Sequence, residues 1–223
     1  MNKKILASIL IIAVAAALIG AGTISYFNDV ETSKNNIFID GTIDLKIRHN
    51  PSDPWTDGVT DTWYVPDMKP GDDIPQRSIW FKNFGTIQTS TMTITCNYTV
   101  TEEDPQTESD TDKHTDQHPD KMAKHMIVTY IHYRDDLIDI DCLTGKNYTQ
   151  SPIEDWRIND TDGDGKITLY DLKQDPLINL PSPDTQPPNK ITQLDMALKF
   201  DIWAGDDFQG DIFNLTLIFT LNQ

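Results

Sequence analysis

The sequence predicts an all-β protein, a jelly-roll-like antiparallel β-sandwich with loop insertions. Apolar and polar residues alternate along several segments, which is the pattern of strands buried on one face. Clusters of glycine, proline, asparagine and aspartate separate these segments, as turns do in antiparallel sheets. At 223 residues the chain is long enough for one sizeable domain with a buried core, which we place at residues 37–223.

Residues 1–25 predict a signal peptide. Lys3 and Lys4 precede an apolar run from Ile5 to Ile19, which is shorter than the membrane span of about 20 residues. Small residues follow, as a signal peptidase requires beside the bond that it cleaves. A retained membrane anchor is the alternative, because the apolar run could extend to Ile24.

Residues 26–36 would form the new N-terminus after cleavage. They place Tyr26, Phe27 and Val30 at a chain end, where polar residues are usual. The segment contains neither proline nor glycine, so its whole backbone can form strand hydrogen bonds. We therefore expect it to dock on a surface, and the alternative is a disordered tail.

Seven strands are expected along the body of the chain. They are expected at residues 37–47 (with a break at Gly41), 78–84, 89–100, 126–133, 137–143, 191–203 and 212–221. Residues 89–100 give the clearest alternation of apolar side chains with threonine and asparagine. Loops are expected at 50–61 and 147–152, and the five prolines of 176–188 predict a linker within the domain.

Residues 101–120 predict an acidic, solvated loop, because they include eight acids, one lysine and no aliphatic side chain. His114 and His118 have the i, i+4 spacing of a helical metal site. A helix is not expected in this composition, so the loop interpretation is preferred. His125 and His132 are expected to be ordinary surface or core residues.

The net charge of −17 excludes binding to nucleic acid or anionic lipid through bulk electrostatics. The leader contributes Lys3 and Lys4 and no acid, so its removal leaves −19. A chain this acidic attracts cations instead.

Residues 160–171 carry the most specific chemical motif, within an insertion at 150–190. The loop has acids at positions 1, 3, 5 and 12, glycine at position 6, and at position 7 a lysine that can offer its backbone carbonyl: Asp160, Asp162, Asp164, Asp171, Gly165 and Lys166. This is EF-hand spacing, and aspartate at position 12 makes the loop similar to a dockerin-type calcium loop. The sequence predicts a structural calcium site, and an acidic turn without an ion is the alternative.

Two further features depend on export. Cys96 and Cys142 would be free to form a disulfide in an oxidising compartment, and two buried thiols are the alternative. Four Asn-x-Thr triplets are candidate glycosylation sites, at Asn97, Asn147, Asn159 and Asn214.

Several stretches resemble the TasA and camelysin family of secreted fibre proteins. The residues that carry the resemblance are Gly22-Thr23, Tyr26-Phe27-Asn28-Asp29, Phe38 to Leu45 (FIDGTIDL), Met68 to Asp72 (MKPGD), Trp80 to Gly85 (WFKNFG) and the closing segments 208–211 and 219–223. Residues 102–188 do not match the pattern.

The resemblance implies cleavage between Ser25 and Tyr26 by a dedicated signal peptidase, and no membrane attachment afterwards. It also implies polymerisation with copies of the same chain by donor-strand exchange, in which the segment 26–36 completes the sheet of a neighbour. Relatives outside bacteria are archaeal, and the four triplets favour such a host.

Three functions follow as hypotheses. The first is a secreted filament subunit of surface fibres or biofilm matrix. The second is a monomeric, calcium-stabilised adhesin or carbohydrate-binding sandwich, with Trp55, Trp63 and Trp156 as stacking residues. The third is a camelysin-like metallopeptidase, which the sequence disfavours because it has no His-Glu-x-x-His motif.

Overall fold

The computed structural model describes residues 42–58, 68–101, 115–148, 156–183, 191–205, 208 and 211–222. The chain divides into two units, Met1–Asp40 and Gly41–Gln223, and all described residues belong to the second. The predicted signal peptide, its cleavage point at Ser25 and Tyr26, and the donor residues Phe27 and Val30 therefore lie outside the described residues. So do Trp63 and His114.

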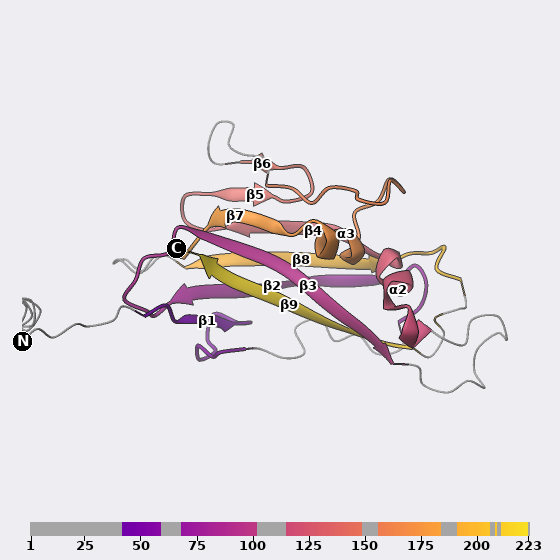
Figure 1. Cartoon of the computed structure of the whole chain (residues 1–223), viewed down its shortest axis with the longest axis horizontal. Coiled ribbons are helices and arrows are strands. Elements are labelled where there is room, and N and C mark those ends of the chain that lie inside the picture. The colour runs from indigo at the N-terminus through magenta and orange to yellow at the C-terminus, as the bar shows by residue number, and fades with distance from the viewer. Residues whose placement is uncertain are drawn as a thin grey trace, which may run out of the picture. The chain divides into compact units, whose positions relative to one another are not determined.

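Two antiparallel sheets make up the second unit, which confirms the predicted all-β sandwich. The six-stranded sheet has the order β1-β2-β8-β4-β5-β6, and the three-stranded sheet has the order β7-β3-β9. In Figure 1, β3 and β9 pass in front of the larger sheet. The strands are β1 (Leu45–Arg48), β2 (Asp73–Asn83), β3 (Thr91–Thr101), β4 (Met126–Arg134), β5 (Asp139–Asp141), β6 (Lys146–Asn147), β7 (Leu177–Pro181), β8 (Thr192–Phe200) and β9 (Ile212–Asn222).

The alternating side chains of the strands form the core. On β3, every second residue from Met92 to Val100 is buried. β3 pairs with β9 along its whole length, with Thr91 opposite Asn222 and Thr101 opposite Ile212. β9 faces β2 across the sandwich, where the rings of Phe81 and Phe219 lie 4.6 Å apart.

The structure differs in part from two predictions about connecting segments, of which residues 102–114 and 184–188 lie outside the described residues. The predicted acidic loop ends in the 3-10 turn η1 (Thr115–Gln117) and the helix α2 (Pro119–His125). Proline at the first helical position and the buried side chains Met122 and Ala123 stabilise α2 despite its acidic surroundings. The predicted linker contains β7, which pairs with β3.

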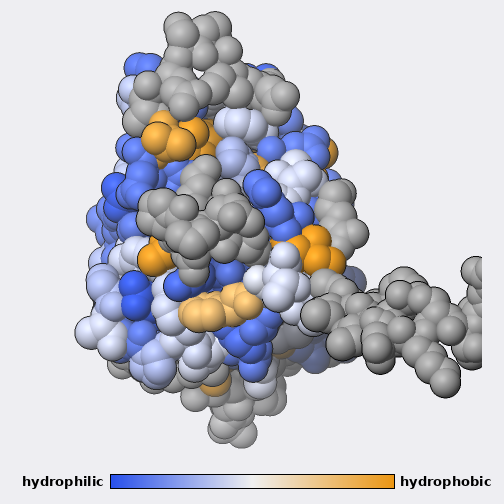
Figure 2. All heavy atoms as spheres, turned by 90° about the vertical axis from the view of Figure 1, so that its left-hand side faces the viewer, coloured by the Kyte–Doolittle hydropathy of each residue, from blue (hydrophilic) through white to orange (hydrophobic). Residues whose placement is uncertain are grey.

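The helices α2 and α3 (Leu169–Gln174) lie together at one end of the sandwich (Figure 1). Figure 2 shows the molecule from the left-hand side of Figure 1, where hydrophilic side chains predominate and apolar ones form separate small groups. No helix among the described residues is both long enough and apolar enough to span a bilayer.

The predicted disulfide is also wrong, because Cys96 and Cys142 are free thiols. Cys96 lies on β3, and its Sγ donates to the carbonyl oxygen of Leu169 at 3.3 Å. Cys142 follows β5 of the other sheet, and its Sγ donates to the carbonyl oxygen of Ile140 at 3.8 Å. Burial raises the pKa of the Cys96 thiol to about 12 and also raises that of Cys142, so both remain protonated.

Candidate functional site

The aspartate loop, which comprises residues 160–171, leads into α3, and hydrogen bonds to its own carboxylates hold its shape. Asp160 accepts hydrogen bonds from the backbone N–H groups of Gly163 at 2.7 Å and Gly165 at 2.8 Å. Both glycines have positive φ, 77° and 83°, a conformation that other residues rarely adopt. The Gly165 N–H bond is the main reason why the pKa of Asp160 is lowered, so the carboxylate stays charged.

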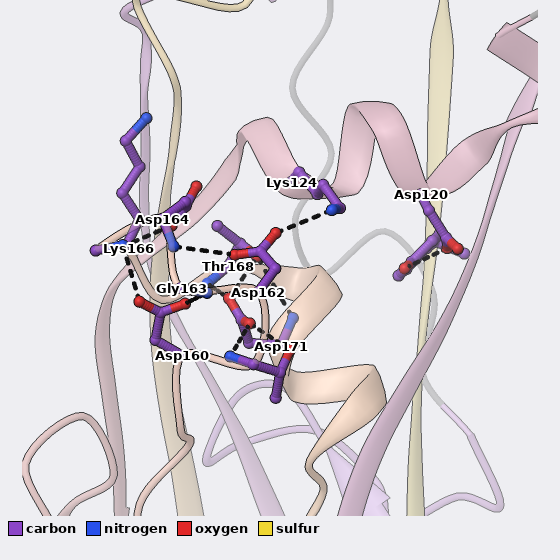
Figure 3. Close-up of polar contacts among 12 residues, drawn as sticks. Asp120, Lys124, Asp160, Asp162, Gly163, Asp164, Lys166, Thr168 and Asp171 are labelled. Carbon is purple, nitrogen blue, oxygen red and sulfur yellow. Dashed lines mark hydrogen bonds and ion pairs between the residues drawn. The ribbon is translucent and has the colours of Figure 1, made fainter.

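Asp160, Asp162 and Asp164 converge, with one carboxylate oxygen of each within 4.8 Å of the others. Figure 3 shows that Lys124 reaches from α2 to this group, and its Nζ lies 3.0 Å from an oxygen of Asp162. Carboxylate oxygens at this spacing suit a hard cation such as calcium. The contact with Lys124 could not be anticipated from the loop sequence, because α2 was not expected.

Asp171, at loop position 12, has a different environment from the other three acids. It is fully buried, and its Oδ1 accepts from the N–H and hydroxyl of Thr161 at 2.8 and 2.7 Å. Its Oδ2 accepts from the N–H and hydroxyl of Thr168 at 2.9 and 2.8 Å, which completes a capping box at the start of α3. The structure therefore brings positions 1, 3 and 5 together and uses position 12 to join the loop to the helix.

Lys166, at loop position 7, connects the loop to the end of β8. Its side chain extends away from the three carboxylates (Figure 3), and its Nζ lies 2.5 Å from Asp201 Oδ2. Burial alone would raise the pKa of Asp201, but the bond from Lys166 and the N–H of Trp203 outweigh it and lower this pKa. The Asp201 bond in turn raises the pKa of Lys166.

A second feature lies where the described chain begins. The segment Thr42–Asp44 runs beside residues 83–87, so two stretches that carry the family resemblance meet in space. Asn83 Oδ1 accepts from the N–H groups of Asp44 at 3.2 Å and Gly85 at 2.9 Å, and its Nδ2 donates to Ile87 O at 3.0 Å. A Cβ at Gly85 would lie 2.0 Å from Thr42 O, so only glycine fits. We call this arrangement the Asn83 clamp.

Residues 68–72, which also carry the family resemblance, form a turn that holds the end of β8. Gly71 has φ of 94°, and its N–H donates to Phe200 O at 2.8 Å. Asp72 accepts from the Phe200 N–H through its carbonyl and from the Lys69 N–H through its side chain. This turn thus has a structural role.

β9 forms one edge of the three-stranded sheet, and its apolar row is only half-buried. The row packs on the core and consists of Phe213, Leu215, Leu217, Phe219 and Leu221. The corresponding residues of β3 are fully buried. Because β9 faces β2, and β1 lies beyond β2, the smaller sheet ends one strand earlier than the larger one on this side.

The described histidines form no metal-binding group of three or more residues. His49, His125 and His132 each face a different carboxylate, of Asp53, Asp201 and Asp139, and His118 begins α2. Within the described ranges, the three aspartates are the one group of His, Cys, Asp or Glu close enough to hold a metal. Trp55 lies under the guanidinium of Arg48, whereas Trp156 packs against the core.

The four candidate glycosylation sites occupy different surfaces. Asn97 and Asn214 are exposed on the outer face of β3 and β9. Asn159 is exposed before the aspartate loop, and its Nδ2 donates to Asp175 at 2.7 Å. Asn147 is half-buried at the end of β6.

The comparison with protein families found one match, to the camelysin metallo-endopeptidase family, over residues 1–223. No curated protein matches the chain. The family match includes the clamp, the Gly71 turn and the aspartate loop, and it confirms the resemblance to the TasA and camelysin family. The chain therefore belongs to the camelysin metallo-endopeptidase family.

Proposed function

We propose that this chain is an extracellular structural subunit that polymerises by donor-strand exchange. The segment 26–36 of one copy would pair with β9 of the next. The half-buried apolar row of β9, at an edge of the smaller sheet, carries the proposal.

The physics of strand addition supports this pairing. An edge strand presents backbone N–H and C=O groups that an extended peptide can satisfy. Side chains at alternate positions of the added strand would then cover the half-buried row, and Phe27 supplies an aromatic group for it, with its neighbour Tyr26 on the opposite face. The Asn83 clamp fixes the chain at Thr42–Asp44, the first described residues after the proposed donor segment.

The aspartate loop would bind calcium as a structural ion. Asp160, Asp162 and Asp164 supply convergent carboxylates, and Asp171 ties the loop to α3. The bound ion would neutralise the repulsion among three carboxylates and hold the loop against α2 and β8. A single loop of this kind corresponds to the weak extracellular sites, with Kd of about 10⁻⁴–10⁻³ M.

The family name favours a metallo-endopeptidase as the second candidate function. Such an enzyme commonly holds zinc through histidine ligands and leaves one position open for water. The described histidines face separate carboxylates, and the convergent group consists of oxygen ligands only. We therefore propose a structural role and no peptidase activity.

Electron microscopy of the chain from residue 26, beside a chain from residue 36, tests the polymerisation. We expect filaments from the first and monomers from the second. Phe27→Ala should weaken assembly about tenfold or more, because it removes one buried aromatic side chain, whereas the matched Asn28→Ala should assemble normally. Filaments from the shorter chain would place assembly elsewhere, and monomers from both chains would refute the homopolymer.

A further inference from the structure

The three-stranded sheet carries no charged residue on any of its strands. The sequences of β3, β7 and β9 are TMTITCNYTVT, LINLP and IFNLTLIFTLN. Every strand of the six-stranded sheet, in contrast, has at least one charged side chain. The difference is notable in a chain with 24% charged residues and a net charge of −17.

The outer face of β3 and β9 consists of threonine, asparagine and isoleucine. We call it the neutral face, and its members are Thr91, Thr93, Thr95, Asn97, Thr99, Thr101, Ile212, Asn214, Thr216, Ile218, Thr220 and Asn222. Ile212 and Ile218 are 48% and 42% exposed. Threonine is a good strand former and would be unremarkable alone. The absence of charge and the exposed isoleucines are what require an explanation.

We propose that the neutral face is a contact surface for a second copy of this chain. Two copies of so acidic a protein repel each other wherever their carboxylates approach, and like charges that face each other disfavour an interface. On the neutral face two copies can meet without this repulsion. The two exposed isoleucines of β9 and the short hydroxyl side chains leave a surface that another sheet can cover.

The size of the face defines the strength of the contact. Its two long strands have 11 residues each. At about 3.4 Å per residue and about 4.8 Å between strands, these two strands cover roughly 360 Å² per partner. A total of roughly 700 Å² is below the ~1,000 Å² of a stable specific interface, so an isolated pair would be weak and transient.

Cysteine cross-linking tests the contact, whether or not the chain forms filaments. Thr95 lies mid-strand on the neutral face, and Thr129 is exposed on β4 of the other sheet. The native thiols are buried and protonated, so a short bifunctional maleimide would react with the introduced cysteine. Linked pairs are counted on a denaturing gel, which dissociates any filament.

We expect Thr95→Cys to give linked pairs and Thr129→Cys to give at least about tenfold fewer. Adding Thr220→Glu to the Thr95→Cys chain should reduce the pairs to a similar extent, while Thr129→Glu should leave them unchanged. Circular dichroism confirms that each variant is folded. Equal yields from the two cysteine positions, or yields insensitive to Thr220→Glu, would overturn the proposal.

Peptide mass spectrometry of the natural protein provides an independent test. Asn97 lies opposite Thr216, and Asn214 lies opposite Thr99, so both candidate glycosylation sites fall inside the neutral face. Glycans there would prevent the contact. We expect both asparagines to be unmodified, and sugar on either one would show that this face carries glycans and does not pair.

Discussion

Asp171→Asn should destabilise the domain even when no calcium is present. The carboxylate is fully buried and accepts four hydrogen bonds, two from Thr161 and two from Thr168. An amide in its place keeps one oxygen and turns an NH₂ group toward two of these donors. A buried donor left unpaired costs about 1–3 kcal/mol, so we expect the free energy of unfolding to fall by about 3 kcal/mol.

Asp160→Asn is the matched comparison, because it removes a carboxylate of the same loop. Asp160 is exposed, and water can replace its bonds to Gly163 and Gly165. In EDTA we expect a much smaller loss of stability than for Asp171→Asn, because water replaces the lost bonds. Calcium at about 100 times its Kd should stabilise the unchanged chain by about 2.7 kcal/mol and Asp160→Asn very little.

Urea unfolding followed by tryptophan fluorescence, in EDTA and in calcium, measures both effects at a concentration below that of assembly. If Asp171→Asn matched the unchanged chain in EDTA, the capping role would be wrong. If calcium stabilised Asp160→Asn as strongly as the unchanged chain, the three-aspartate site would be wrong. The two roles are therefore refuted by different measurements.

Three further predictions concern the clamp, the thiols and acid stability. Gly85→Ala should lower the free energy of unfolding by about 1–3 kcal/mol or more, measured in urea, because its Cβ would overlap Thr42 O. Thiol titration should find no reactive cysteine in the folded chain and two after denaturation without reductant; none after denaturation would indicate a disulfide. The pKa of Asp201 is lowered from 3.8, so its contribution is present above about pH 4 and is lost as the pH falls through the folded value. Stability measured from pH 5 to pH 2 should therefore fall less steeply in Asp201→Asn, and parallel curves would contradict this.

Alternation and turn residues were enough to predict the sandwich, because a strand with one buried face repeats every two residues. β3 and β9 follow this rule from end to end. The rule failed where contacts with other strands determine which side chains are buried. Asp195, which stands between the apolar Leu194 and Met196, is itself fully buried on β8, where Arg134 pairs with it at 2.6 Å. β7 was not predicted, because its five residues lie among prolines and are too few to show an alternating pattern.

The sequence predicts the spacing of the acids in the aspartate loop, but not the different role that each acid has. Loop position 12 follows from the sequence, yet its four threonine bonds depend on how Thr161 and Thr168 fold around it. Lys124 is also absent from any local pattern, because α2 and the loop are about 40 residues apart and meet only in the folded domain.

Several residues that carry the family resemblance have structural roles in the fold. Asn83 and Gly85 clamp the segment at Thr42, and Gly71 turns the chain onto the end of β8. These residues therefore hold Thr42–Asp44 and the end of β8 in the described domain. The family match therefore includes residues that stabilise the fold. The prediction is that Asn83→Ala impairs folding and assembly together, as measured by unfolding and electron microscopy. Normal filaments from a destabilised Asn83→Ala chain would show that the clamp does not position the donor segment.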